Sequence, residues 1–346
     1  MPAAISPERS QSGITKFTNC RIIKGGRLVS EDLWISSYTG KILPAQAVFY
    51  GHQVVPDLTL DLENKIVSPG FIDVQFNGAY GFDFSQFGDL SSYQKGYRQL
   101  NQKLVQTGLT SYLPTIITQK AEVYHNVLPL LGPSGGDRNA DAGAESLGAH
   151  VEGPFMNPTK KGVHNAAILR TATEGFASLE ECYGAKNLLQ TKSLAKVKMI
   201  TAAPEVDGIM DTIPELASRG IVFSIGHTEA DYEKASEAID NGATMITHLF
   251  NAMKPLHHRD PGVFGLLGQN HGTRRPYFGL IADGIHLHPT TTKIAWAAYP
   301  DGMILVTDAL ALMGMEDGVY DWINGDKIVK QGPNLTKEGT DTIAGG

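Results

Sequence analysis

The amino-acid sequence predicts an α/β protein in which a TIM-type (β/α)8 barrel follows a small β domain. Of its 346 residues, 42% are hydrophobic and 19% are charged, a balance typical of a globular protein with a sizeable core. Up to Pro69, short strand-like runs alternate with turn signals. From Gly70 onward, eight apolar runs alternate with stretches long enough for a helix. This repeated alternation is typical of a barrel of parallel strands.

The region before the barrel is expected to consist of a tail and a β unit. Residues 1–14 are polar and contain Pro2, Pro7 and several serines, which predicts a flexible tail. We assign residues 15–69 to the small β domain and residues 70–346 to the barrel. Within the β domain we expect strands at residues 16–23, 32–36, 54–62 and 65–67.

The eight apolar runs of the second region are the expected barrel strands. Their starts lie 23 to 50 residues apart, which leaves room for a crossover helix each time. Continuous apolar runs also suit strands that are buried on both faces. The expected strands cover residues 71–76, 110–116, 147–152, 197–202, 221–225, 244–248, 278–282 and 303–307.

Polar and ionisable side chains recur where these expected strands end. The loops that follow the strands form the active face of a TIM-type barrel, so side chains from distant parts of the chain should meet there. The side chains in question are Asp73, Gln75, Asn77, Glu152, His227, His248, Asp283, His286 and Asp308. His150 shares a strand face with Glu152, and we expect it to fill the barrel interior.

Three of these residues have the side chains of a catalytic metal site. Glu152, His227 and His248 lie 75 and 21 residues apart, so only the barrel can bring them together. Two imidazoles, one carboxylate and an open water position are typical of catalytic zinc. Asp308 is the candidate proton shuttle beside that water. Each residue alone could instead be a satisfied polar group at a strand end, or a helix cap for Asp308, but the set of four favours the metal site.

Composition and charge exclude several classes of protein. The net charge of −7, from 29 basic and 36 acidic residues, argues against a nucleic-acid partner. The first 20 residues lack the apolar run of a signal peptide, and no apolar stretch is long enough to predict a membrane span. Two cysteines cannot form a disulfide framework, so we expect a cytoplasmic protein.

Five motifs at the strand ends follow one another in a familiar order. They occupy residues 152–154, 226–228, 247–253, 282–286 and 306–309. In this order the chain resembles the N-acetylglucosamine-6-phosphate deacetylases of the amidohydrolase superfamily over nearly its whole length. The resemblance implies a metal-dependent amidohydrolase barrel and a small β-sandwich built from the N-terminal segment and a C-terminal segment. Because that family continues past its last substrate loop, we expect this chain, which stops at Gly346, to lack the C-terminal segment.

The resemblance also implies roles for individual residues. Glu152, His227 and His248 correspond to the metal ligands. Asp308 corresponds to the catalytic acid and base, and His164 to the histidine that polarises the acetamide carbonyl, a role that suits an imidazole N–H. The other implied substrate contacts are Val163, Asn251, Ala252, Arg259, Asp283, Gly284, Ile285, His286, Ile343, Ala344 and Gly345.

The resemblance also implies an oligomeric state through Arg259. The corresponding arginine of the family reaches the phosphate of a substrate held in the partner subunit, so a homodimer is implied. A guanidinium suits a phosphate dianion because it offers paired donors. From the residues alone, Arg259 could also be a solvated surface charge, and His164 could be exposed in its loop.

The residues at the end of the first expected barrel strand indicate how many metal ions the chain binds. Many members of the superfamily hold a second metal with two histidines there, whereas this chain has Gln75 and Asn77. Neutral amides are poor ligands for zinc. We therefore expect one divalent ion per chain, most simply Zn²⁺, with Fe²⁺, Co²⁺ and Mn²⁺ accepting similar ligands.

The implied reaction is hydrolysis of the acetamide of N-acetyl-D-glucosamine 6-phosphate to D-glucosamine 6-phosphate and acetate, in amino-sugar catabolism. One alternative is an amidohydrolase that acts on another amide, such as an N-acyl amino acid or a cyclic amide. The phosphate-side residues Asn251 and Arg259 argue against it. A second alternative is a non-catalytic, truncated relative, against which the retained metal ligands and Asp308 argue.

Overall fold

The computed structural model describes residues 12–45, 55–133, 139–189, 196–269, 274–322 and 325–345. Residues 1–11 of the predicted tail, the first residue of the strand predicted at 54–62, and Gly346 lie outside the described residues. The predicted tail extends too far, because Ile14 begins the first strand and the carboxylate of Asp57 accepts hydrogen bonds from the backbone N–H groups of Ser12 and Gly13. The chain divides into two compact units, Met1–Gly70 and Phe71–Gly346.

The first unit is built around one five-stranded sheet. Its strand order is β2 to β1 to β3 to β4, and β5 pairs in parallel with β1. A two-residue turn joins β1 to β2, in which Gly25 and Gly26 both have positive φ, +56° and +72°, as the tight turns of hairpins require. The strands are β1 (Ile14–Lys24), β2 (Arg27–Ser30), β3 (Leu33–Ser36), β4 (Ile42–Leu43) and β5 (Leu58–Val67).

One prediction for this unit is wrong in its detail. The strands expected at residues 54–62 and 65–67 are a single strand, β5. Glu63 and Asn64 have positive φ, +51° and +62°, and form an irregularity across which the pairing with β1 continues. A local bulge therefore looked like a strand boundary in the sequence.

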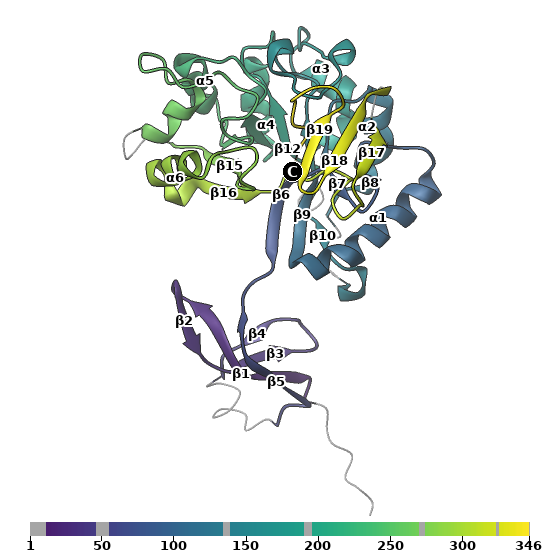
Figure 1. Ribbon diagram of the computed structural model, residues 1–346, viewed down its shortest axis with the longest axis vertical. Coiled ribbons are helices and arrows are strands. Elements are labelled where there is room, and N and C mark those ends of the chain that lie inside the picture. The colour runs from purple at the N-terminus through teal and green to yellow at the C-terminus, as the bar shows by residue number, and fades with distance from the viewer. Residues whose placement is uncertain are drawn as a thin grey trace, which may run out of the picture. The chain divides into compact units, whose positions relative to one another are not determined.

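The second unit is a parallel eight-stranded barrel, as predicted. Several of its strands and the helices around them are labelled in Figure 1. Each expected strand is present, with ends that differ by at most two residues. The barrel closes between β6 and the residues after β16 through a parallel bridge between Phe76 and Ala309. In order around the barrel, the strands are β6 (Phe71–Phe76), β9 (Leu109–Ile116), β11 (Ala149–Glu152), β12 (Val197–Ala202), β13 (Val222–Ile225), β14 (Met245–Ile246), β15 (Tyr277–Ile281) and β16 (Met303–Val306).

Helices connect successive strands of the barrel. Asp89 and Asp231 cap α1 and α5, since each carboxylate accepts a hydrogen bond from a backbone N–H of the first turn. The helices are α1 (Leu90–Leu104), α2 (Ala121–Val127), α3 (Phe176–Tyr183), α4 (Ile213–Ser218), α5 (Tyr232–Asp240) and α6 (Pro289–Ala298). The 3-10 helices are η2 (Val105–Thr107), η3 (Leu128–Leu130), η4 (Ala140–Ala142), η5 (Pro158–Lys160), η6 (Ala166–Ile168), η7 (Ala185–Leu188), η8 (Met210–Thr212), η9 (Gly262–Gly268) and η10 (Pro300–Gly302).

A three-stranded antiparallel sheet follows the last barrel strand and was not anticipated from the sequence. It consists of β17 (Gly318–Asp321), β18 (Lys327–Gln331) and β19 (Asn334–Lys337). Ile328 and Leu335 are buried in one hydrophobic cluster with Leu310 and Trp322, so the sheet packs together with residues that follow β16. The smaller strands β7 (Gly78–Ala79) and β8 (Phe82–Asp83) pair with each other, and β10 (Glu145–Ser146) pairs with β9.

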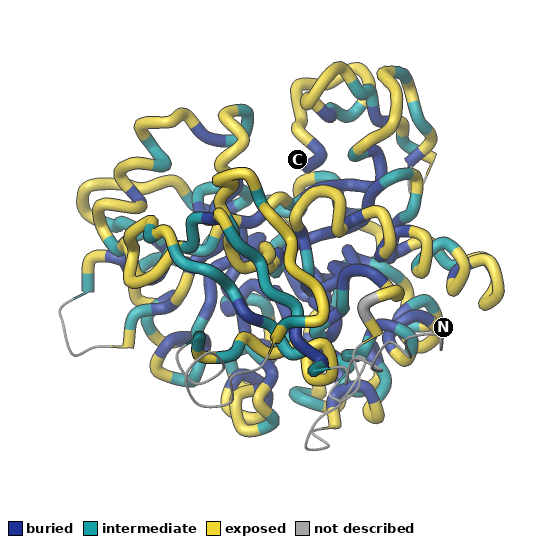
Figure 2. Tube along the Cα trace, turned by 90° about the horizontal axis from the view of Figure 1, so that it is seen from below, coloured by how far each residue is buried: buried dark blue, intermediate teal, exposed yellow. Residues whose placement is uncertain are grey.

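Polar side chains occupy part of the barrel interior, whose central segments are buried (Figure 2). His150 is fully buried, as expected, and its two ring nitrogens contact the hydroxyls of Thr115 and Thr201 at 3.2 and 2.7 Å. The chain of contacts continues from Thr201 to Thr247 at 2.6 Å. Burial lowers the pKa of His150 to about 4, so the ring is neutral.

Candidate active site

Three side chains from three strands converge at the carboxyl end of the barrel. Glu152 is the last residue of β11, and His227 and His248 each lie two residues beyond the end of their strand. Nε2 of His227 and Nε2 of His248 lie 3.3 and 3.2 Å from Oε1 of Glu152, and the two nitrogens are 3.1 Å apart. All three side chains are buried. The fold therefore brings together the residues that the sequence suggested as metal ligands.

The orientation of His227 suits a metal ligand. Its Nδ1 lies 2.7 Å from the carbonyl oxygen of Lys160, and a carbonyl only accepts, so Nδ1 carries the proton and Nε2 presents a lone pair. A lone pair and a buried carboxylate that face each other fit a shared cation.

His227, His248 and Asp308 share an unusual backbone conformation. Their φ angles are +51°, +28° and +51°, in the left-handed region that residues other than glycine rarely adopt. Each residue lies two positions beyond the last residue of its barrel strand. Strained backbone of this kind clusters at functional sites, where the surrounding fold maintains it.

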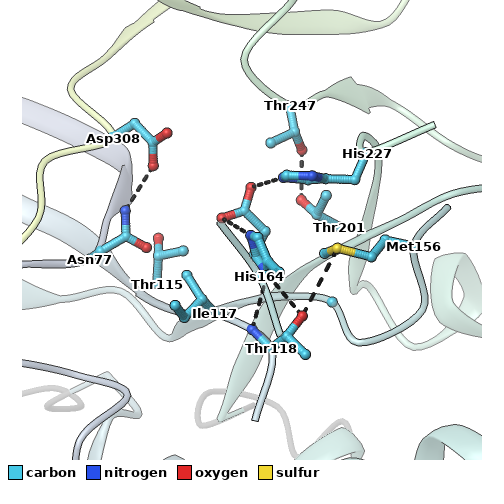
Figure 3. Close-up of polar contacts among 12 residues, drawn as sticks. Asn77, Thr115, Ile117, Thr118, Met156, His164, Thr201, His227, Thr247 and Asp308 are labelled. Carbon is cyan, nitrogen blue, oxygen red and sulfur yellow. Dashed lines mark hydrogen bonds and ion pairs between the residues drawn. The ribbon is translucent and has the colours of Figure 1, made fainter. Parts of the chain in front are cut away.

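Asp308 is placed where β6 and the end of β16 meet. Asn77 donates a hydrogen bond of 2.7 Å from Nδ2 to Oδ1 of Asp308 (Figure 3). Burial, then the charge of Glu152, raises the pKa of Asp308 to about 7, although His248 and Asn77 lower it. No α-helix follows Asp308 among residues 309–322 and 325–345, so the alternative role as a helix cap has no support.

Gln75 and Asn77 act as hydrogen-bond donors to the carboxylates. Nε2 of Gln75 lies 3.2 Å from Oε1 of Glu152, as Asn77 lies beside Asp308. Their amide groups are thereby used to orient acidic side chains. Among the described residues, the group of potential ligands whose atoms come within 4.8 Å of one another is Glu152, His227 and His248.

His164 is buried beside the same carboxylate, which argues against the exposed alternative. Its Nε2 lies 4.0 Å from Oε2 of Glu152. The backbone N–H of Thr118 donates to Nδ1 at 3.3 Å, and the Thr118 hydroxyl lies 2.8 Å from the same atom (Figure 3). Burial lowers the pKa of His164 to about 3. The ring is therefore neutral, with its proton on Nε2.

One cavity of about 390 Å³ is lined by Asn77, Glu152, His164, His227, His248 and Asp308. A larger groove of about 990 Å³ elsewhere on the unit contains none of them, so volume alone does not mark the site. The smaller cavity holds most of the residues predicted to contact substrate, namely Val163, His164, Asn251, Ala252, His286, Ile343, Ala344 and Gly345. A side chain at Gly345 would come within 2.8 Å of the carbonyl oxygen of Asp308, so only glycine fits there.

Four predicted contacts do not line this cavity. Arg259 is exposed, and its backbone N–H donates to Nδ1 of His257 at 3.3 Å. Asp283, Gly284 and Ile285 form a turn in which Oδ1 of Asp283 accepts the backbone N–H of Ile285 at 2.8 Å. Oδ2 of Asp283 also lies 2.7 Å from Nδ1 of His286. The turn therefore positions His286, which does line the cavity.

Three residues in or beside the cavity were not identified from the sequence. Thr118 holds His164, while Ile117 and Trp322 line the cavity. Ile117 and Thr118 directly follow β9, and this position at a strand end is the signal that could have identified them. Trp322 belongs to the unanticipated region after β17, for which the repeated strand and helix pattern offered no signal.

Comparison with known proteins shows a family and individual relatives to which this chain is similar. The amidohydrolase family matches residues 66–313. The N-acetylglucosamine-6-phosphate deacetylase of Danio rerio is 45% identical over 339 residues, covering 97% of this chain and 80% of the relative.

Two solved structures are similar throughout the chain. The N-acetylglucosamine-6-phosphate deacetylase of Pasteurella multocida has a TM-score of 0.77 at 27% identity, with 96% of this chain and 80% of that chain covered. A variant of the enzyme from Mycobacterium smegmatis, in complex with N-acetyl-D-glucosamine-6-phosphate, has a TM-score of 0.75 at 26% identity, with 97% and 80% covered. In the described part of the chain, no helix is long and apolar enough to cross a membrane.

Proposed function

This chain belongs to the amidohydrolase family, and from that premise we propose that it hydrolyses the acetamide of N-acetyl-D-glucosamine 6-phosphate, giving D-glucosamine 6-phosphate and acetate. The observation that carries the proposal is that Glu152, Asp308 and His164 line one cavity together with His227 and His248. A relative 45% identical over 97% of the chain bears the name of this deacetylase. Neither another amide substrate nor a non-catalytic role has comparable support.

Glu152, His227 and His248 would hold one divalent ion, for which we propose Zn²⁺. When bound, such an ion lowers the pKa of a water and polarises a carbonyl oxygen. The ligand set supports this choice because two neutral imidazoles and one carboxylate are typical of catalytic zinc. The proposal of a single ion is supported by Gln75 and Asn77, whose amides donate to the two carboxylates.

Asp308 is assigned the proton transfers. A carboxyl group whose pKa lies near 7 exists in both protonation states around neutral pH, so it can accept a proton and return one. We assign it to take the proton of the attacking water and to deliver a proton to the departing amine. Asn77 keeps Oδ1 of Asp308 occupied and so presents the other oxygen for this exchange.

His164 is assigned to the acetamide oxygen. Its neutral ring has Nδ1 occupied by Thr118, so its Nε2–H is the group left to donate. A donor that is already oriented in a buried site stabilises negative charge as it develops on the carbonyl oxygen.

The remaining polar groups are assigned to the sugar phosphate. Asn251 and Ala252 line the cavity and are placed on the phosphate side. His286, oriented by Asp283, is assigned to the sugar together with residues 343–345. Arg259 is exposed and outside the cavity of its own chain, and we propose a homodimer in which it reaches the neighbouring site.

We place this reaction in the cytoplasm. Cys20 and Cys182 are both free thiols, which suits a reducing compartment.

An acetate-release assay tests the function. Purified protein loaded with Zn²⁺ is expected to release acetate from N-acetylglucosamine 6-phosphate and to lose this activity with a chelator. Unphosphorylated N-acetylglucosamine is the matched substrate, for which we expect a large loss in kcat/KM. Failure of the zinc-loaded protein to release acetate from the phosphorylated sugar would disprove the proposal.

A further inference from the structure

One wall of the active-site cavity is apolar. The wall residues are Ile117, Val163, Leu310, Trp322 and Ala344, which all line the cavity. The same five residues belong to, or pack against, one hydrophobic cluster that is completed by Leu312, Tyr320, Ile328 and Leu335. The wall is therefore the surface of a packed core and not a set of scattered apolar side chains.

This wall adjoins the reacting groups. Ile117 precedes Thr118, whose hydroxyl lies 2.8 Å from Nδ1 of His164 (Figure 3). Val163 directly precedes His164, and Leu310 lies two residues after Asp308. These apolar side chains therefore line the same cavity as Asp308, the proton-transfer group, and His164, the group assigned to the carbonyl oxygen.

Most of the rest of the lining is polar, although Ala252, Ile281 and Ile343 also line the cavity. Thr159, Lys160, Asn251, His286 and Asp341 line the same cavity and offer hydrogen bonds and charge. Sugar hydroxyls and a phosphate require such polar partners, whereas the methyl of an acetyl group requires an apolar surface. In an acetamide that methyl is bonded directly to the reacting carbonyl carbon. It must therefore lie beside the reacting groups, where the wall is.

We propose that the wall, closed by the indole of Trp322, is an acyl-size filter that accepts acetyl and excludes longer acyl groups. This inference rests on the proposed deacetylase function and specifies which acyl groups the enzyme hydrolyses. Ile117, Leu310 and Trp322 are only 6%, 2% and 8% exposed, so the packed cluster behind them leaves little room to move. An additional methylene would overpack this surface.

Trp322 is the residue at which this inference can be tested most cleanly. Its Nε1 has no hydrogen-bond partner among the described residues, so Trp322→Phe removes no bond that the described part of the chain contains. The smaller ring leaves space on the cavity side of the wall. Leu310→Val is a second variant that removes volume at a different point of the same wall.

The experiment compares kcat/KM for the N-acetyl, N-propanoyl and N-butanoyl forms of glucosamine 6-phosphate in the zinc-loaded protein. For the wild type we expect N-propanoyl to react at least about 10-fold less efficiently than N-acetyl, the order of discrimination that one methylene allows. Trp322→Phe and Leu310→Val should each raise the ratio of N-propanoyl to N-acetyl efficiency by roughly 10-fold.

Leu335→Val is the matched control, because Leu335 lies in the same cluster but does not line the cavity. It should leave the ratio unchanged, and thermal unfolding of each variant reports its packing. If Leu335→Val shifts the ratio as much as Trp322→Phe, loosening of the cluster explains the effect and the inference fails.

Failure of the inference is distinct from failure of the proposed function. A wild type that hydrolyses N-acetyl, N-propanoyl and N-butanoyl substrates equally well is a deacylase without the filter. The filter is also overturned if Trp322→Phe and Leu310→Val both fold and both leave the ratio of N-propanoyl to N-acetyl efficiency unchanged. If the wild type hydrolyses none of the three, the proposed function and the inference fall together.

Discussion

Asn77 donates a hydrogen bond of 2.7 Å to Asp308, a residue 231 positions away in the chain. The same neighbourhood closes the barrel, since the backbone N–H of Asn77 donates to the carbonyl of Ala309 and that of Asp308 to the carbonyl of Gln75, both at 2.9 Å. The contacts that close the barrel therefore also fix the position of Asp308, the proton-transfer group.

Asp308→Asn should abolish most of the deacetylase activity. The amide can neither accept the proton of the attacking water nor return one to the amine, so we expect kcat to fall by about 10²–10⁴-fold. Metal content and thermal stability should stay near the wild-type values, because Asp308 is not among the proposed ligands. Near wild-type acetate release by the folded variant contradicts the role given to Asp308.

Asn77→Ala should shift the pH dependence of the reaction. The amide of Asn77 stabilises the charged form of Asp308 and so lowers its pKa, and removing the amide raises that pKa. Because the carboxylate form must accept the first proton, the acid limb of the kcat/KM profile should move to higher pH. The measurement is a pH profile of acetate release, and a profile that keeps its acid limb but loses rate at every pH would argue for a purely structural role.

His248→Asn should remove the metal. One ligand fewer leaves two groups for the ion, so metal retained after gel filtration should fall well below one equivalent per chain, and activity should fall with it. His258→Asn is the control, because His258 is exposed and outside the cavity. Full retention of metal by His248→Asn would show that the ligands have been misassigned.

Arg259→Ala should raise KM for the phosphorylated sugar, because a guanidinium that pairs with the phosphate is lost. Mixing Arg259→Ala chains with Asp308→Asn chains tests whether the residue acts across subunits. In a mixed dimer, the site with an intact Asp308 receives Arg259 from its partner, so activity at low substrate should exceed that of either variant alone. No gain after subunit exchange would mean that Arg259 does not act on the partner's site.

Asp83→Asn should stabilise the protein above neutral pH. Burial raises the pKa of Asp83 to about 6, above its ordinary value of 3.8, although hydrogen bonds from Ser85 lower it. The contribution of the protonated carboxyl to stability is full below pH 3.8 and is lost as the pH rises through 6. An asparagine avoids that loss, so at pH 8 the variant should be more stable by about 2–3 kcal/mol.

Unfolding at pH 4 and pH 8 checks this prediction. The difference between Asp83→Asn and the wild type should be small at pH 4 and largest at pH 8. An equal difference at both values would exclude titration of Asp83 as its cause.

Much of the barrel was predictable because strand burial leaves a local signature. Continuous apolar runs identified all eight barrel strands to within two residues. Glu152, His227, His248 and Asp308 were recognisable because each stands at the end of such a run. β17 to β19 were not predictable in this way, since they follow the eighth barrel strand and lie outside the repeat of strand and helix.

The sequence by itself determined which residue types stand at the strand ends, and therefore which chemistry the barrel face can offer. Only the tertiary structure decided which of them meet: Asn77 with Asp308, Thr118 with His164, and Trp322 with the cavity. It also separated Arg259 from the cavity of its own chain. The physical reason is that hydrophobic periodicity reports burial within one segment, whereas these contacts depend on barrel closure and on loop conformations that join distant segments.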